Sequence, residues 1–142
     1  MQRILFGLLG LIPFIFPPMA ILMGWLPSAQ SQSIFLLYSA IILTFLAGSQ
    51  WGYALRGSVP KETLTISIVL SLVGWFVLVA MDLSALPSRW ALLLLVLGFI
   101  ACLVQDYRLY RGQSAYLKLR TMLTGIVLLA HLVLSIVLMG LA

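Results

Sequence analysis

This chain of 142 residues is 63% hydrophobic and only 8% charged, with a formal net charge of +5. A water-soluble domain of this size has too little interior to bury so much apolar side chain, so the composition excludes a soluble globular protein and predicts that lipid is the solvent. Nucleic-acid binding is not expected, because the basic residues stand beside apolar runs, where they face anionic lipid.

Five apolar runs follow one another along the chain, each close to the ~20 residues that cross a ~30 Å hydrocarbon layer. They cover residues 4–24, 33–55, 63–81, 90–106 and 118–141. We therefore predict an all-α integral membrane bundle of five transmembrane helices, forming a single domain over residues 1–142. Polar connections are expected at residues 28–33, 56–62, 82–89 and 107–117.

The first run contains three prolines, Pro13, Pro17 and Pro18. Proline has no N–H, so three backbone carbonyls lose their usual helical donor. We favour a kinked span whose freed carbonyls meet neighbouring Ser or Thr hydroxyls. The alternative is a broken helix that lines a polar cavity, as in transporters. Arg3 and the apolar stretch behind it also resemble a secretory signal, but the stretch continues to Trp25, so we expect an uncleaved first helix.

Small residues recur every four positions in the second run, and they form one ridge: Ala40, Thr44, Gly48 and Gly52. Such ridges let helix backbones approach closely in lipid, and residues 48–52 form a G-x-x-x-G motif. Ser67 and Ser71 in the third run and Gly98 in the fourth continue the pattern. We expect these seven residues to form helix packing seams, either within the chain or between two copies.

Basic residues are distributed unevenly between the predicted connections. Only Arg89 falls on one side of the five-span topology, and seven residues fall on the other: Arg3, Arg56, Lys61, Arg108, Arg111, Lys118 and Arg120. The positive-inside rule then predicts a cytoplasmic N-terminus and an outside C-terminus, in a bacterial cytoplasmic (inner) membrane. Arg108, Arg111 and Lys118 are expected to contact anionic lipid headgroups.

A polar cluster is predicted where the fourth span ends and the fifth begins. Asp106 and Arg120 share this depth, and opposite charges half in lipid are retained best as a pair. Gln50 lies just inside the same boundary, and Trp51 and Tyr116 are placed beside it. The cluster is interpreted as a clamp between helices, with a ligand site formed by these five residues as the alternative.

His131 is the single histidine, and Cys102 is the single cysteine, so neither an internal disulfide nor a multi-ligand metal site is expected. We favour a neutral His131 bonded to Ser135 or to another helix, and the alternative is a histidine that carries a proton or ligates haem. The chain has no G-x-S-x-G elbow and no phosphate-binding loop. We therefore expect no catalytic residues, no metal and no cofactor.

Several segments resemble a family of small bacterial inner-membrane proteins known only as a domain of unknown function. The most specific is Gly48-Ser49-Gln50-Trp51-Gly52, and further matches are Gly10 to Phe14, Asp106, Tyr116 to Arg120 and Leu123-Thr124. A small mitochondrial transmembrane protein is similar too. Many relatives have histidine at the position of Gln50, which implies hydrogen bonding, not acid–base chemistry, for the glutamine here. The resemblance implies five spans and no established activity.

We therefore expect a non-enzymatic helper or scaffold subunit of a membrane complex, with membrane lipids and either a second copy or another membrane protein as partners. The competing hypothesis is a binder or enzyme for a membrane-soluble molecule, such as a quinone or lipid, that uses Gln50, Trp51, Asp106, Tyr116 and Arg120.

Overall fold

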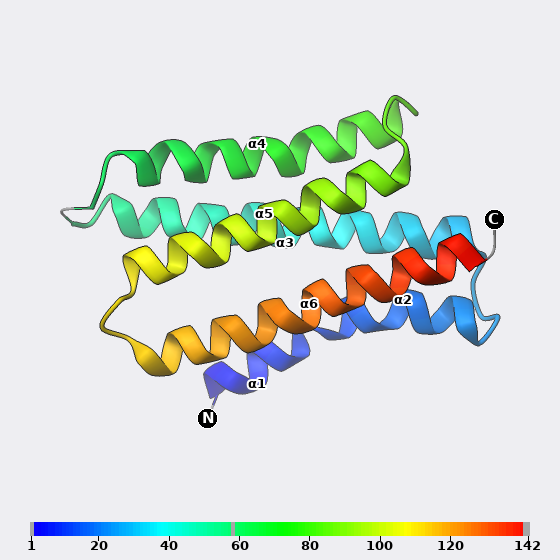
Figure 1. The fold of residues 1–142 in the computed structure, drawn as a ribbon, viewed down its shortest axis with the longest axis horizontal. Helices are drawn as coiled ribbons and strands as arrows, with labels where there is room; N and C mark the ends of the chain where they lie inside the picture. Colours follow the sequence, from blue (N-terminus) through cyan, green and yellow to red (C-terminus); the bar gives the residue numbers. More distant parts are fainter. Residues whose placement is uncertain (1, 58, 141–142) are drawn as a thin grey trace.

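Five helical rods run side by side along the molecule, and the first is broken in two (Figure 1). The computed structural model describes residues 2–57 and 59–140. Its helices are α1 (Gln2–Leu9), α2 (Ile12–Leu22), α3 (Ser28–Ala54), α4 (Glu62–Asp82), α5 (Ser88–Leu109) and α6 (Ser114–Gly140). Five stretches of the described chain are long and apolar enough to cross a membrane, and no strand occurs among these residues. The predicted all-α, five-span architecture is confirmed.

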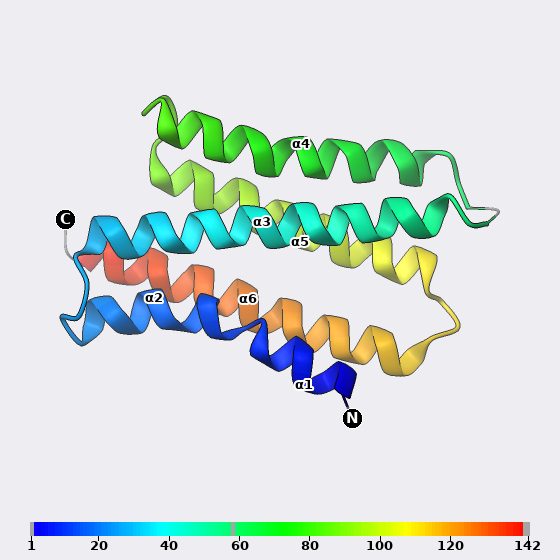
Figure 2. The same ribbon diagram turned by 180° about the vertical axis from the view of Figure 1, so that it is seen from behind.

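Helices α2, α3, α5 and α6 form a closed ring, and α4 packs on the outside of α3 and α5. Helix α3 packs against α2, α4 and α5, while α6 packs against α1, α2 and α5, and α4 also touches α5 (Figures 1 and 2). Phe14, Phe35 and Leu43 are buried at the centre of this arrangement. Large apolar side chains also point outwards, for example Phe45, which is 68% exposed. Such an exterior requires lipid around the bundle.

The long helices extend beyond the predicted spans. Residues 28–33, expected to be a loop, form the first turns of α3, and the predicted connection 107–117 shrinks to residues 110–113. Helices α3 and α6 each have 27 residues, which at ~1.5 Å per residue is about 40 Å. Because this exceeds the ~30 Å hydrocarbon layer, polar residues at the helix ends lie at headgroup depth and remain helical. Hydropathy alone therefore predicted helices that are shorter than those in the structure.

The first span breaks at Gly10 and Leu11, one residue before α2 begins. The backbone N–H of Phe14 donates to the Leu11 carbonyl at 3.0 Å, so the Gly10 carbonyl loses its helical donor. The hydroxyl of Tyr38 on α3 donates to this carbonyl at 2.9 Å. The first span is interrupted as its prolines suggested, and the carbonyl that Tyr38 satisfies is that of Gly10, which is not one of the three carbonyls four residues before the prolines.

Two connections, α2 to α3 and α4 to α5, have the same backbone design. Two residues after each helix ends, the backbone has a positive φ, 67° at Gly24 and 53° at Ser84. The following N–H groups return to a carbonyl inside the helix, that of Ala20 in the first turn and that of Ala80 in the second. This is the Schellman arrangement, which satisfies the last carbonyls of a helix. Each turn then has a proline directly before the next helix, Pro27 and Pro87.

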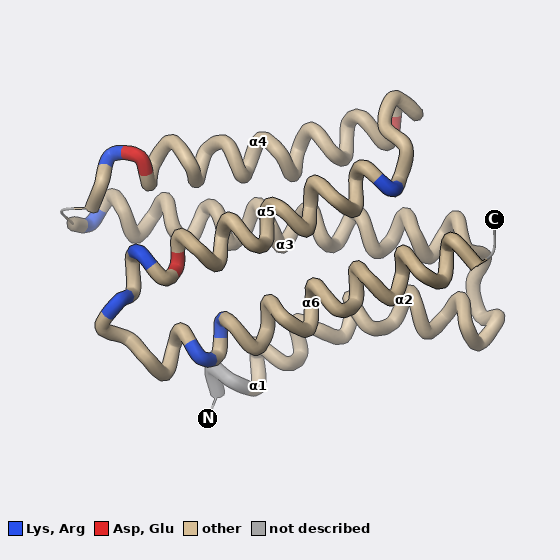
Figure 3. Tube along the Cα trace, in the orientation of Figure 1, with Lys and Arg blue, Asp and Glu red and all other residues tan. Residues whose placement is uncertain are grey.

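Charged residues are concentrated at one end of the bundle. The connections α3 to α4 and α5 to α6 lie there together with the start of α1, and most of the Lys and Arg residues stand in these connections or in the adjoining turns of α5 and α6 (Figure 3). Arg89 stands at the opposite end, where α5 begins. The side chain of Arg3 and all of Ser58 lie outside the described residues. Helix α1 begins and α6 ends at opposite ends of the bundle (Figure 1). The compartment that each end faces stays a prediction.

Candidate functional site: a buried polar clamp and two open grooves

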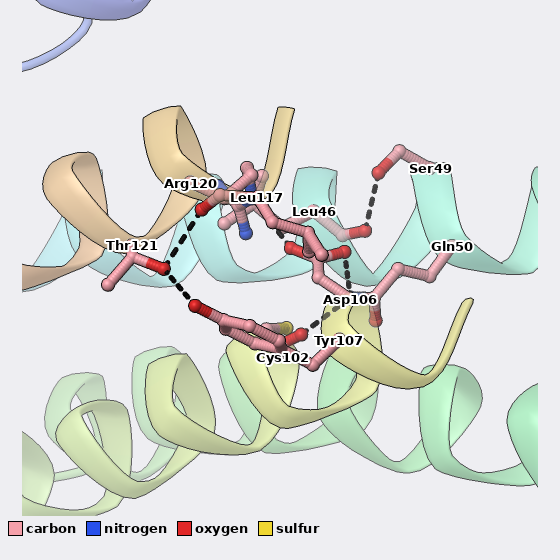
Figure 4. Close-up of polar contacts among 9 residues, drawn as sticks. All are labelled: Leu46, Ser49, Gln50, Cys102, Asp106, Tyr107, Leu117, Arg120 and Thr121. Atoms are coloured by element: carbon pink, nitrogen blue, oxygen red, sulfur yellow. Dashed lines mark hydrogen bonds and ion pairs between the residues drawn. The ribbon is translucent and has the colours of Figure 1, made fainter. Parts of the chain in front are cut away.

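Asp106 forms the centre of the polar cluster. It lies in the last turn of α5, and its side chain is 2% exposed. The Arg120 side chain on α6 donates from Nε to the Asp106 Oδ2 at 2.6 Å (Figure 4). The ion pair predicted from the sequence is therefore present, and it joins the two helices on either side of the short 110–113 connection. A nearby second link joins the same helices, because the hydroxyls of Tyr107 and Thr121 lie 2.8 Å apart.

Gln50 extends the cluster to α3. It is buried, and its Nε2 donates to the Asp106 Oδ1 at 2.8 Å and to the Cys102 carbonyl at 2.8 Å. Each carboxylate oxygen of Asp106 therefore accepts a hydrogen bond from a different helix. The Gln50 Oε1 has no hydrogen-bond partner among the described residues. The arrangement is a three-helix clamp whose charges compensate each other in a region closed to water.

Of the other two predicted cluster residues, Trp51 lies outside the cluster and Tyr116 stands at its edge, next to Asp106. Trp51 is 44% exposed and lines a groove between α3 and α4, because the next residue on a helix turns ~100° away from Gln50. Tyr116 is half-buried in a row of three aromatic rings. Its ring centroid lies 4.6 Å from that of Tyr110, and the Tyr110 centroid lies 4.6 Å from that of Tyr53. Tyr110 lies just after α5, and burial raises the pKa of its phenol, helped by the nearby charge of Asp106.

A second polar contact, between α5 and α4, was not predicted from the sequence. Gln105, next to Asp106 on α5, donates from Nε2 to the Thr63 carbonyl at 3.0 Å and to the Ser67 Oγ at 3.2 Å. It joins α5 to α4 as Gln50 joins α3 to α5. An available signal was the glutamine itself, since a neutral amide near the end of an apolar span usually finds a partner on another helix.

At some glycines the space where a side chain would stand is occupied by neighbouring atoms, and at others it is empty. A Cβ at Gly98 would stand 2.6 Å from Leu43, and one at Gly74, which the sequence analysis did not single out, would stand 2.6 Å from Thr44 and 3.1 Å from the Ala40 carbonyl. A Cβ at Gly48 or Gly52 would meet nothing within 4 Å. Helices α3 and α4 are therefore tightly packed at Ala40 and Gly74, and the Gly48 and Gly52 positions further along α3 are open.

This open face borders a groove of about 260 Å³ on the outside of the bundle. Its lining consists of Gly48, Trp51, Ser67, Ile68, Ser71 and Leu72. Ser71 borders this groove, while the buried Ser67 also accepts the Gln105 hydrogen bond at the contact with α5.

His131 is buried on α6 among aromatic rings. Its Nδ1 lies 2.8 Å from the Val127 carbonyl, and its ring centroid lies 4.6 Å from that of Phe35. The expected bond from the imidazole to Ser135 is wrong, because the Ser135 hydroxyl donates to the His131 backbone carbonyl. Among residues 2–57 and 59–140, no group of three or more His, Cys, Asp or Glu side chains is arranged to hold a metal ion.

Comparison with known proteins places the chain in a family. Residues 2–136 match the family described as Protein of unknown function (DUF3429). Transmembrane protein 69 of Xenopus tropicalis is 31% identical over 123 residues, which cover 83% of this chain and 47% of that protein, so the chain spans about half of the relative's length. No solved structure matches the chain. The chain, a multi-pass membrane protein, therefore belongs to the DUF3429 family.

Proposed function

We propose that this protein is a non-enzymatic helper or scaffold subunit of a membrane complex in a bacterial cytoplasmic (inner) membrane, with its N-terminus in the cytoplasm. The observation that carries this proposal is the open glycine face of α3. Gly74 and Gly98 are filled by side chains of the same chain, whereas Gly48 and Gly52 have no neighbour within 4 Å where a Cβ would stand. Glycines at this spacing favour a close helix contact in lipid.

The occupant that fits this face is a transmembrane helix of another membrane protein. The groove beside Gly48 is lined by Ser67 and Ser71 on its α4 side and by Trp51 on its α3 side. Small residues let a partner backbone approach, and the rim offers apolar contact from Ile68 and Leu72. A partner helix would cover the Gly48 position, which the side chains of this chain leave open.

The polar clamp supports a structural role for the cluster and not a ligand site. Most polar atoms of the cluster are already paired within the chain, because both oxygens of Asp106 accept hydrogen bonds and the Gln50 amide nitrogen donates twice. The Gln50 Oε1 is left without a partner among the described residues. The cationic end of the bundle, with Arg108, Arg111 and Lys118 around the short connection, suits the anionic headgroups of the inner leaflet.

A photoreactive residue at Leu72, which is 55% exposed at the groove, tests the proposal in native membranes. We expect one cross-linked membrane protein in stoichiometric amount, and loss of this product in Gly48→Leu. The matched control is a photoreactive residue at Leu129, which is 58% exposed on α6 and outside the groove. Equal products at both positions, or a product that survives Gly48→Leu, contradict a docked helix. A product made only of two copies of this chain identifies a self-assembling scaffold instead.

A further inference from the structure

A second groove lies between α5 and α6 at the end of the bundle opposite the clamp. It has a volume of about 410 Å³, within the ~300–1,000 Å³ of small-ligand pockets. Its walls are mainly leucine and valine, and its polar lining consists of Arg89, His131 and Ser135, with Trp90 beside Arg89. A smaller hollow of about 220 Å³ shares Arg89, Leu92 and Ser135 with it, so the groove continues towards Gln32 and Ser88.

His131, which lines this groove, has a hydrogen-bond acceptor without a partner in the described structure. A carbonyl oxygen only accepts hydrogen bonds, so the 2.8 Å contact with Val127 requires the proton on the His131 Nδ1. The Nε2 of the neutral ring is then a lone-pair acceptor, and it has no partner among the described residues although the residue is 1% exposed. An unpaired buried acceptor is unfavourable unless something supplies a donor.

No nearby hydroxyl of the chain supplies that donor. Ser135 lines the groove, but its hydroxyl donates to the His131 backbone carbonyl at 2.8 Å. Ser31 and Ser39, one turn to either side of Phe35, are buried with their own hydroxyls unpartnered in the described structure, so neither reaches the ring. The missing donor therefore has to come from outside the described chain.

The imidazole is also held in one position. The rings of Phe35 and Phe99 meet it edge to face, with centroids 4.6 and 5.7 Å away, and Phe14 lies 6.1 Å away. Together with the Val127 contact, this packing fixes the direction of the Nε2 lone pair before any ligand binds, which lowers the entropy lost on binding.

We propose that this groove binds a lipid-soluble molecule whose hydroxyl group donates a hydrogen bond to the Nε2 of His131. The apolar walls hold the body of the molecule. Arg89, whose guanidinium lies 5.9 Å from the Trp90 ring centroid, faces the membrane boundary and offers its N–H donors to an acceptor nearer the headgroups. Two chemical sources fit this description, an aliphatic alcohol and a hydroquinone.

The single histidine makes the test direct. We would prepare the protein with ¹⁵N-histidine and no histidine tag in phosphatidylcholine nanodiscs, whose headgroup has no O–H or N–H donor, and record the Nε2 resonance. Decylhydroquinone is expected to move it towards the position of a hydrogen-bonded nitrogen. The oxidised decylquinone has the same skeleton and only acceptors, so we expect no such shift.

A third probe, 1-decanol, separates the two sources. A shift with both donors supports a site for any lipid alcohol, and a shift with the hydroquinone alone supports a site for a ring hydroxyl. Equal shifts with the quinone and the hydroquinone overturn the proposal. It is also overturned if neither donor moves the resonance, including the case in which water already holds Nε2 in a hydrogen bond.

A matched pair of variants locates the binding event. Leu93→Trp fills the groove from α5, and Leu97→Trp places the same ring one turn further along the helix, outside the lining; the two leucines are 45% and 53% exposed. We expect the shift to disappear in Leu93→Trp and to persist in Leu97→Trp. Persistence in both variants overturns the placement of the ligand in this groove.

Discussion

Arg120 on α6 and Asp106 on α5 form an ion pair, Nε to Oδ2 at 2.6 Å, inside the cationic end of the bundle. The other carboxylate oxygen accepts from Gln50 on α3, so one carboxylate joins three helices. Because the aspartate is almost completely buried, the contribution of each partner depends on the presence of the others.

This dependence predicts a strong coupling between the two charged residues. Asp106→Asn leaves the guanidinium unpaired, and Arg120→Gln leaves the carboxylate unpaired, so each single change is expected to lower the free energy of unfolding by about 3 kcal/mol. The double variant removes both charges and should lose clearly less than the sum. Unfolding of the four proteins in bicelles measures the coupling, and strict additivity contradicts a clamp.

Gln50 should matter much more than its neighbour. Gln50→Ala removes two buried hydrogen bonds, to Asp106 and to the Cys102 carbonyl, and is expected to destabilise the protein by about 1–3 kcal/mol. Ser49→Ala is the matched control, because the Ser49 hydroxyl is exposed and donates only to the Leu46 carbonyl of its own helix. Equal losses in the two variants would mean that the buried amide has no special role.

Gly74 and Gly48 should differ in how substitution by alanine changes the stability of the protein. Gly74→Ala places a methyl group 2.6 Å from Thr44 and should cost about 1–3 kcal/mol through overpacking. Gly48→Ala meets nothing within 4 Å, so it should leave stability unchanged or raise it by up to ~1 kcal/mol through helix propensity. Thermal unfolding of both variants checks the pair, and a loss in Gly48→Ala alone contradicts the packing described here.

Tyr38 should stabilise the break in the first span. Tyr38→Phe leaves the Gly10 carbonyl without its 2.9 Å donor, and a loss of about 1 kcal/mol is expected. Tyr107→Phe is a suitable control, because its hydroxyl contact with Thr121 is exposed. Hydrogen exchange at residues 10–14 should increase in the first variant only; unchanged exchange there would mean that another group satisfies the carbonyl.

Alkaline pH should weaken the cationic end through Tyr110. Its pKa is raised in the folded protein, chiefly by burial, so folding favours the neutral phenol. The corresponding stability is complete below the unfolded pKa of ~10 and is lost as pH rises through the folded value. Tyr110→Phe should therefore show a smaller fall in stability above about pH 10 than the wild type. A spectrophotometric titration in which Tyr110 ionises at an ordinary or lower pH contradicts this expectation.

The sequence was sufficient where a property depends on neighbouring residues along one helix. Apolar length predicted five spans, and shared depth predicted the Asp106–Arg120 pair, because the end of one helix and the start of the next return to the same membrane boundary. The helix ends at residues 28 and 109 were misplaced, since hydropathy averages do not distinguish a helical turn at headgroup depth from a loop.

Amino-acid composition and periodicity by themselves thus determined that this protein is a five-helix membrane bundle with its cations concentrated at one end. Only the tertiary structure decided that Gln50 points inwards while Trp51 faces a groove, and that Gly74 is filled while Gly48 is open. Helical periodicity gives the angle between two side chains on one helix, but packing against other helices sets how that helix is rotated. The burial of His131 has the same origin, because residues of α2, α3 and α5 all have to meet α6 before its ring is enclosed.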